Sequence, residues 1–133
     1  MGGIATLFIC SYNRNMNIEK PVTHIMTLRP SPFAAIKSGN KIIEMRLNDE
    51  KRKLISVGDI LSFENTETHE IIYCEVLGLK SFPSFKEIYE YYKPEEIGYA
   101  KNEHPDYHDM AQYYNDEKIA KYGTLGIRIR LLK

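Results

Sequence analysis

The sequence lacks tryptophan, has only two cysteines, and contains no apolar run long enough to cross a bilayer. Cys10 and Cys74 form no C-x-x-C pair and cannot make a disulfide framework, so we expect reduced thiols in a cytoplasmic protein. The short apolar run at residues 4–10 has no basic residue before it. We therefore expect neither a secretory signal nor a membrane partner.

The sequence also has no net charge, because 18 basic residues balance 18 acidic ones. This balance argues against a strongly basic nucleic-acid binder. The distribution is uneven: residues 37–53 carry six basic and three acidic side chains, residues 118–133 carry five basic and no acidic ones, and residues 64–117 carry thirteen acidic and four basic ones. If the two basic segments meet in space, they make a positive face that attracts a polyanion. The alternative is a set of solvated edges without a partner.

Internal repeats, low-complexity tracts and Pro/Gly-rich linkers are absent as well, and 133 residues suffice for one domain with its own core. We expect residues 1–22 to be a poorly ordered N-terminal extension and residues 23–133 to form the single domain. Met16 is an alternative start, which leaves open whether residues 1–15 belong to the native protein.

The first half of the domain has clear element signals. A strand is predicted at His24–Leu28, followed by a short helix with Ser31 as N-cap, Pro32 at the first helical position and Gly39 at its end. Residues 41–47 alternate as in a strand, which predicts two faces. One face carries Ile43, Met45 and Leu47, and the other carries Ile42, Glu44 and Arg46.

The second half predicts strands at Ile60–Glu64 and Ile71–Leu79, a helix that begins with the capping box Ser84–Glu87, a helix over Asp106–Tyr114, and a closing strand at Leu125–Leu132. The connections between the middle strands are too short for parallel crossovers. The order of elements therefore predicts an α+β fold: a small, mostly antiparallel, partly closed barrel with short helices at its ends.

The most specific segment is the corner between the short helix and the second strand. Lys41, Glu44 and Arg46 gather there directly after Gly39. Together these charges are able to hold an anion, orient a carboxylate or move a proton. The alternative is an ion-pair network that only solvates the face of a strand.

This corner resembles the G-x-K-x-x-E-x-R motif of the ASCH (activating-signal-cointegrator homology) family, with Gly39, Lys41, Glu44 and Arg46 in place. Further stretches similar to the family lie at residues 28–39, 57–63 and 122–127. The resemblance covers residues 24–132 and implies a PUA-like barrel with a cleft floored by these three charged residues. Family members are thought to bind RNA, which makes RNA or a nucleotide-like anion the expected ligand.

The resemblance also raises the possibility of catalysis. One branch of the family removes the acetyl group from N4-acetylcytidine with a lysine and, three residues later, a threonine nucleophile. Lys41 matches the lysine, but Glu44 occupies the threonine position, and a carboxylate replaces an activated hydroxyl poorly. Another branch is suggested to cleave RNA. The alternative to a binding domain is therefore a small hydrolase of RNA or a modified nucleoside, with Lys41 and Glu44 as acid–base pair. A third hypothesis is binding of a small anionic metabolite.

Several other residues are candidates for contacts with the ligand. Arg29 follows the first strand, Lys51 and Arg52 form a basic run that suits a phosphate-contacting rim, and Arg128 lies on the last strand. The basic run and Arg128 are equally compatible with a solvated surface, whereas Arg29 is placed to line the same cleft. Tyr114 is the candidate for a cleft wall on which a base stacks, although most tyrosines here are expected to pack against the sheet.

The sequence predicts neither a metal site nor a cofactor. His104 and His108 are four residues apart, but Pro105 breaks the helix that would align them. No glycine-rich phosphate loop is present. The sequence does not indicate an oligomeric state.

Overall fold

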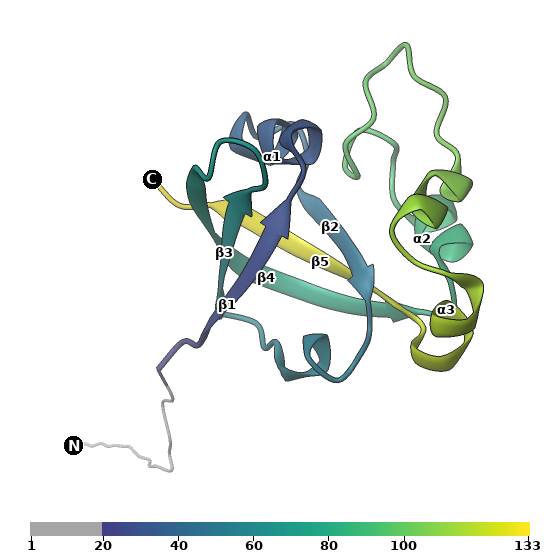
Figure 1. Ribbon diagram of the computed structural model, residues 1–133, viewed down its shortest axis with the longest axis horizontal. Helices are drawn as coiled ribbons and strands as arrows, with labels where there is room; N and C mark the ends of the chain where they lie inside the picture. Colours follow the sequence, from purple (N-terminus) through teal and green to yellow (C-terminus); the bar gives the residue numbers. More distant parts are fainter. Residues whose placement is uncertain (1–19) are drawn as a thin grey trace, which may run out of the picture.

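A computed structural model describes residues 20–133, and its centre is a five-stranded sheet curled into a half-barrel (Figure 1). Residues 1–19 of the expected extension lie outside the described residues, and the division at residues 22 and 23 stays a prediction. The strands are β1 (Thr23–Leu28), β2 (Ile43–Leu47), β3 (Ile60–Asn65), β4 (Ile71–Phe82) and β5 (Thr124–Leu131). The helices are α1 (Pro30–Lys37), α2 (Phe85–Tyr91) and α3 (Asp116–Tyr122), with the 3-10 helices η1 (Arg52–Leu54) and η2 (Tyr107–Gln112).

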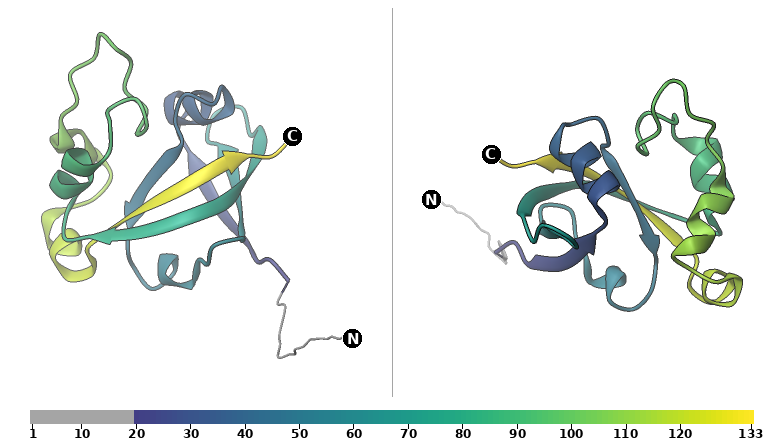
Figure 2. Two further views of the ribbon diagram at one scale, coloured as in Figure 1. Left: turned by 180° about the vertical axis from the view of Figure 1, so that it is seen from behind. Right: turned by 45° about the horizontal axis from the view of Figure 1, so that its top comes forward.

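The strand order is β1-β3-β4-β5-β2, so that β1 and β2 are the two edges of the sheet. β1 pairs with β3 in parallel, and the other three pairings are antiparallel. The predicted α+β class and the mostly antiparallel barrel are therefore confirmed. Residues 83–123, which we call the helical insertion, connect β4 to β5 along the chain. They stand to one side of the barrel (Figure 2).

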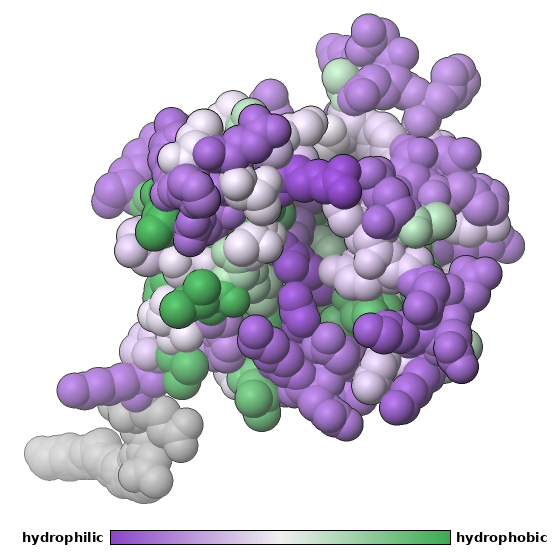
Figure 3. Space-filling model, in the orientation of Figure 1, coloured by the Kyte–Doolittle hydropathy of each residue, from purple (hydrophilic) through white to green (hydrophobic). Residues whose placement is uncertain are grey.

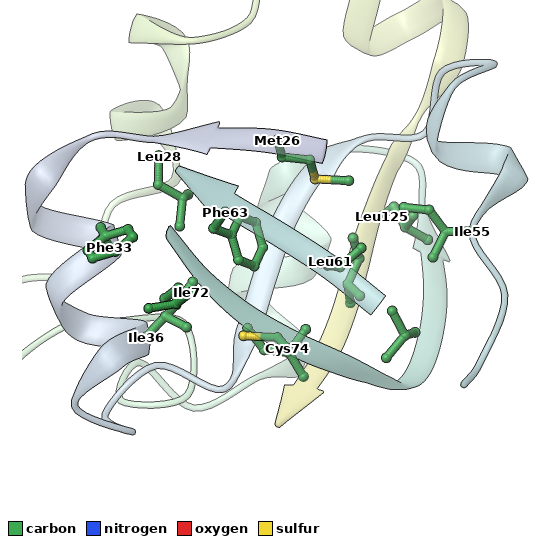
Figure 4. Packing of buried hydrophobic residues seen from close by; sticks show 13 residues of the cluster. Met26, Leu28, Phe33, Ile36, Ile55, Leu61, Phe63, Ile72, Cys74 and Leu125 are labelled. Carbon is green, nitrogen blue, oxygen red and sulfur yellow. The ribbon is translucent and has the colours of Figure 1, made fainter. Parts of the chain in front are cut away.

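The barrel interior is filled by an apolar cluster from β1, β3, β4, β5 and α1, with Ile55 added from the loop before β3 (Figure 4). Leu61, Phe63, Cys74 and Ile127 are fully buried at its centre. Close packing of such side chains is the main source of stability in a domain of this size. A second cluster joins the outer face of β2 to the helical insertion and includes Ile43, Met45, Phe85, Ile88, Ile97 and Met110.

β2 separates these two clusters and is buried along its whole length. Ile43 and Met45 face the helical insertion, as the alternation predicts. Glu44 lies opposite Ile127 on β5, and Arg46 lies opposite Leu125. Since both partners belong to the barrel cluster, the two charged side chains are on the barrel side of the strand. The hypothesis of a merely solvated charged face is wrong, because these side chains are buried.

The structure corrects several predicted element boundaries. α1 begins at Pro30 with Arg29 as N-cap, instead of using Ser31 and Pro32, because a proline at the first position needs no amide donor. β2 begins at Ile43, two residues late. Residues 107–112 form the 3-10 helix η2 in place of the α-helix expected over residues 106–114. Gly39 ends α1 as predicted, with φ at +86°, a conformation that favours glycine.

Candidate functional site

The centre of the candidate site is a buried chain of three charges. Lys41 Nζ lies 2.9 Å from Glu44 Oε1, and Arg46 Nε donates to Glu44 Oε2 at 2.7 Å. The exposed fractions are 8% for Lys41, 3% for Glu44 and 9% for Arg46. Burial alone would raise the pKa of Glu44, but the charges of Lys41 and Arg46 outweigh it and lower that pKa from 4.5 to about 2. Glu44 is therefore a carboxylate at neutral pH.

Arg46 also joins the two edges of the sheet. Its Nη2 donates to the backbone carbonyl of Thr27 at 2.9 Å, so a side chain on β2 reaches β1. We call the gap between these two edge strands the barrel seam. Burial would lower the pKa of Arg46, but the carboxylate of Glu44 raises it above the usual value. The guanidinium is thus a permanent cation. It links the two edge strands through Thr27, and it also forms part of the cleft floor.

The helical insertion packs against Lys41 and against the start of β2. The carbonyl of Glu96 accepts hydrogen bonds from the amides of Ile42 and Ile43, which fastens the insertion to the start of β2. Gly98 has φ at +107°, and a Cβ there would lie 3.1 Å from Cδ of Lys41. Glycine at this position lets the loop lie against the lysine stem.

A cleft of about 690 Å³ lies between the barrel seam and the helical insertion. Figure 3 shows this face hollowed between the two parts, with hydrophilic residues across the hollow. The charged lining residues are Arg29, Lys41, Glu44, Arg46, Glu103 and Asp109, and the tyrosines are Tyr89, Tyr99, Tyr113 and Tyr114. The structure therefore brings together five of the residues singled out in the sequence: Arg29, Lys41, Glu44, Arg46 and Tyr114.

Arg29 spans the mouth of this cleft. From the junction of β1 and α1 its Nη1 donates to Gln112 Oε1 at 3.2 Å, and its guanidinium carbon lies 5.1 Å from the ring centre of Tyr113. Tyr113 is 43% exposed. Tyr114 is half-buried, with its ring stacked on Phe85 at 5.5 Å, and burial raises its pKa. Tyr113 is thus the accessible ring of the two, and Tyr114 is mainly a packed wall.

Three of the predicted contact residues lie outside this cleft. Lys51 and Arg52 sit at η1, where Arg52 pairs with Asp49 at 3.1 Å. Arg128 lies 3.5 Å from Glu96 and borders a second hollow of about 280 Å³, which Lys41 also lines. The structure gives these three residues no place around Glu44.

A hydrogen-bonded chain on the insertion wall was missed by the sequence reasoning. Tyr99 donates to Asp109 Oδ2 at 2.6 Å and lies 2.8 Å from the hydroxyl of Tyr89, which must then be the donor of that second bond. Burial and the bond to Asp109 raise the pKa of Tyr99. Residues 93–105, which include Tyr99, have no regular spacing of apolar residues, and the abundance of tyrosine was the signal that the sequence offered.

Among residues 20–133 no group of three or more His, Cys, Asp or Glu side chains is placed to hold a metal. In the same part of the chain, no helix is both long and apolar enough to span a membrane. Cys74 lies in the barrel core, where burial, with the charge of Glu44, raises the pKa of its thiol to about 11. This thiol is therefore an inert core residue and not a nucleophile.

Comparison with known proteins points to one family. A family model of the ASCH domain matches residues 26–133. The hypothetical protein PH0355, known from a crystal structure, is 31% identical, with a TM-score of 0.71 over 84% of this chain and 100% of its own. Protein PF0455 from Pyrococcus furiosus is 29% identical, with a TM-score of 0.65 over 84% and 99%.

A crystal structure of ASCH from Zymomonas mobilis is 15% identical, with a TM-score of 0.58 over 81% of this chain and 66% of that one, and supports the fold alone. No curated protein matches the chain. The resemblance predicted from the motif is thereby confirmed, together with the PUA-like, barrel-like architecture.

Proposed function

Because this chain belongs to the ASCH domain family, we propose that it binds RNA or a nucleotide in the cleft between the barrel seam and the helical insertion. The observation that carries the proposal is the Lys41–Glu44–Arg46 chain on the floor of a cleft of about 690 Å³. Ligand pockets of roughly 300–1,000 Å³ hold molecules the size of a nucleotide.

The floor is suited to oxygen acceptors. Two cations flank one carboxylate, which leaves the buried chain with an excess positive charge. Lys41 uses one of its three N–H donors on Glu44, so two remain for a phosphate or carbonyl oxygen that enters the cleft. Charge-assisted bonds of this kind are among the stronger polar contacts in proteins. Glu44, with both oxygens occupied, holds the two cations in position.

The mouth is suited to an aromatic base. Tyr113 is accessible there, and stacking of a base on such a ring is worth about 1–3 kcal/mol. Arg29 lies over one face of the same ring, so a base would stack on the other face, and its guanidinium supplies a further cation at the entrance. A ligand with a phosphate and a base therefore finds a partner for each.

Hydrolysis of RNA or a modified nucleoside is the second candidate, because Lys41 and Glu44 lie 2.9 Å apart and both line the cleft. With a pKa of about 2, however, Glu44 is a weak base at neutral pH, and the ideal catalytic pKa lies near the working pH. This argument favours binding over an acid–base role. The cytoplasmic location stays a prediction.

The test is fluorescence anisotropy with a labelled single-stranded RNA at two salt concentrations. The variants are Lys41→Met, which removes a charge from the cleft floor, and Lys51→Met, which removes the same charge from an exposed position outside the cleft. We expect at least about tenfold weaker binding for Lys41→Met and less than about twofold for Lys51→Met. Thermal unfolding of both variants shows whether the fold is kept.

The same samples, run on a denaturing gel, distinguish the two candidates. Intact RNA with binding that depends on Lys41 supports the binding function. Shortened RNA from the wild type, absent with Lys41→Met, would replace it by the hydrolase. Equal losses for both variants would reduce the interaction to general charge attraction, and no binding of RNA or of nucleoside monophosphates would refute the proposal.

A further inference from the structure

The floor and the insertion wall of the cleft carry opposite net charges. Lys41 and Arg46 outnumber Glu44 on the floor, and Arg29 reaches across the mouth to Gln112. Glu103 and Asp109 stand on the wall made by the helical insertion. A ligand that is negative on every side would meet the two carboxylates. The insertion wall instead requires a part of the ligand that donates hydrogen bonds.

Asp109 is fixed in this wall by the tyrosine chain. Tyr99 donates to its Oδ2 at 2.6 Å and accepts from Tyr89 at 2.8 Å. Because the pKa of Tyr99 is raised, the hydroxyl keeps its proton and its donor role at neutral pH. The other oxygen, Oδ1, accepts no hydrogen bond from residues 20–133. It is a positioned acceptor on the surface of the cleft.

We propose that Asp109 makes the cleft selective for nucleobases that carry an exocyclic amino group, an inference that rests on the nucleotide binding proposed above. A carboxylate only accepts hydrogen bonds, and adenine, cytosine and guanine each present an N–H₂ donor to it. Uracil presents a single N–H between two carbonyl oxygens, and these oxygens repel a carboxylate. The oxygens of the sugar and phosphate then face Lys41 on the floor and Arg29 at the mouth.

The test compares labelled oligo-C and oligo-U of equal length by anisotropy. Their rings are the same size, so stacking on Tyr113 differs little and the ratio of affinities reports hydrogen bonding. For the wild type we expect oligo-C to bind about tenfold more tightly. Asp109→Asn supplies an amide that both donates and accepts, and the ratio falls to about one. The matched control Glu95→Gln removes an exposed acid outside the cleft and keeps the wild-type ratio.

Failure of this inference is distinguishable from failure of the proposed function. If neither oligonucleotide binds, the nucleotide-binding function itself is refuted. If both bind wild type equally, or if Asp109→Asn keeps the preference for oligo-C, only the role of Asp109 is overturned. Amide exchange of the insertion in Asp109→Asn shows that the tyrosine chain still folds, because the new amide oxygen still accepts from Tyr99.

Discussion

The barrel and the helical insertion build the two walls of one cleft by different means. The barrel wall rests on a contiguous apolar cluster, and the charges on and just before β2 are buried and paired. The insertion wall rests on a smaller cluster, and the loop over residues 100–106 and the start of η2 are exposed. Regions with few buried contacts and exposed backbone open locally at low free energy. The barrel therefore supplies charge held by its core, whereas the insertion wall opens more easily and holds Asp109 through the hydrogen bond from Tyr99.

Two sites at the start of β2 connect these regions, so single substitutions are able to test the connection. Glu96 holds two amides at the start of β2, and Gly98 lies against Lys41. Changes to the barrel charges should act on the whole fold, whereas changes to the insertion should act on one wall only. The variants below test this distinction in order of decreasing effect.

Glu44→Gln is expected to cause the largest loss. It leaves Lys41 and Arg46 buried without their counter-ion, and breaking a buried ion pair costs about 3–5 kcal/mol. Urea unfolding monitored by tyrosine fluorescence measures this loss. The control is Glu70→Gln, which breaks the exposed pair with Lys37 and costs at most about 1 kcal/mol. Equal losses for the two variants would show that the buried charges stabilise the fold no more than an exposed ion pair does.

The stability of the wild type depends on the charge of Glu44 in a defined pH range. Its pKa in the folded protein, about 2, lies below the ordinary 4.5. The contribution is therefore complete above pH 4.5 and is lost as the pH falls toward 2. Its size is about 3 kcal/mol. The measurement is the difference in unfolding free energy between wild type and Glu44→Gln, which removes the effects of other acids. It should shrink between pH 4.5 and 2, and a constant difference would contradict the pairing.

The barrel wall was largely predictable from the sequence, and the insertion wall was not. On β2 a period of two placed Glu44 and Arg46 on one face, and the motif that includes Lys41 marked them as a unit. Their burial was not predictable, because the helical insertion and the barrel seam enclose them from parts of the chain far away in sequence. Local patterns fix local geometry, whereas burial depends on tertiary contacts.

In the insertion, tertiary contacts replace local pattern. Tyr99 lies in a loop without a sequence period, and Asp109 lies in a 3-10 helix where the spacing predicted an α-helix, so the side chains that face the cleft were not predictable. Lys51, Arg52 and Arg128 show the same limit for basic residues. Charge along the chain predicts a rim, whereas the fold places these side chains outside the cleft around Glu44, so their contact with a ligand stays a prediction.

Gly98→Ala tests the connection itself. Backbone strain at φ +107° and the approach of Cβ to Lys41 at 3.1 Å should together cost about 1–3 kcal/mol and loosen the insertion. Gly58→Ala is the matched control, because Gly58 has φ at +95° but an added methyl group would meet no atom within 4 Å. Amide exchange by mass spectrometry should show faster opening of residues 93–115 in Gly98→Ala alone. Faster exchange in the barrel would mean that the two regions open together.

Tyr99→Phe is expected to have the smallest effect on stability. It removes the hydroxyl between Tyr89 and Asp109, and the loss of such a hydrogen bond costs about 0.5–1.5 kcal/mol. The barrel should be unaffected, since this hydroxyl bonds only to residues of the insertion wall. Asp109 keeps its charge but loses its fixed position, so RNA still binds while the preference for oligo-C over oligo-U weakens. If stability falls and that preference is unchanged, Asp109 is held by other contacts, and the tyrosine chain serves only the packing of the insertion.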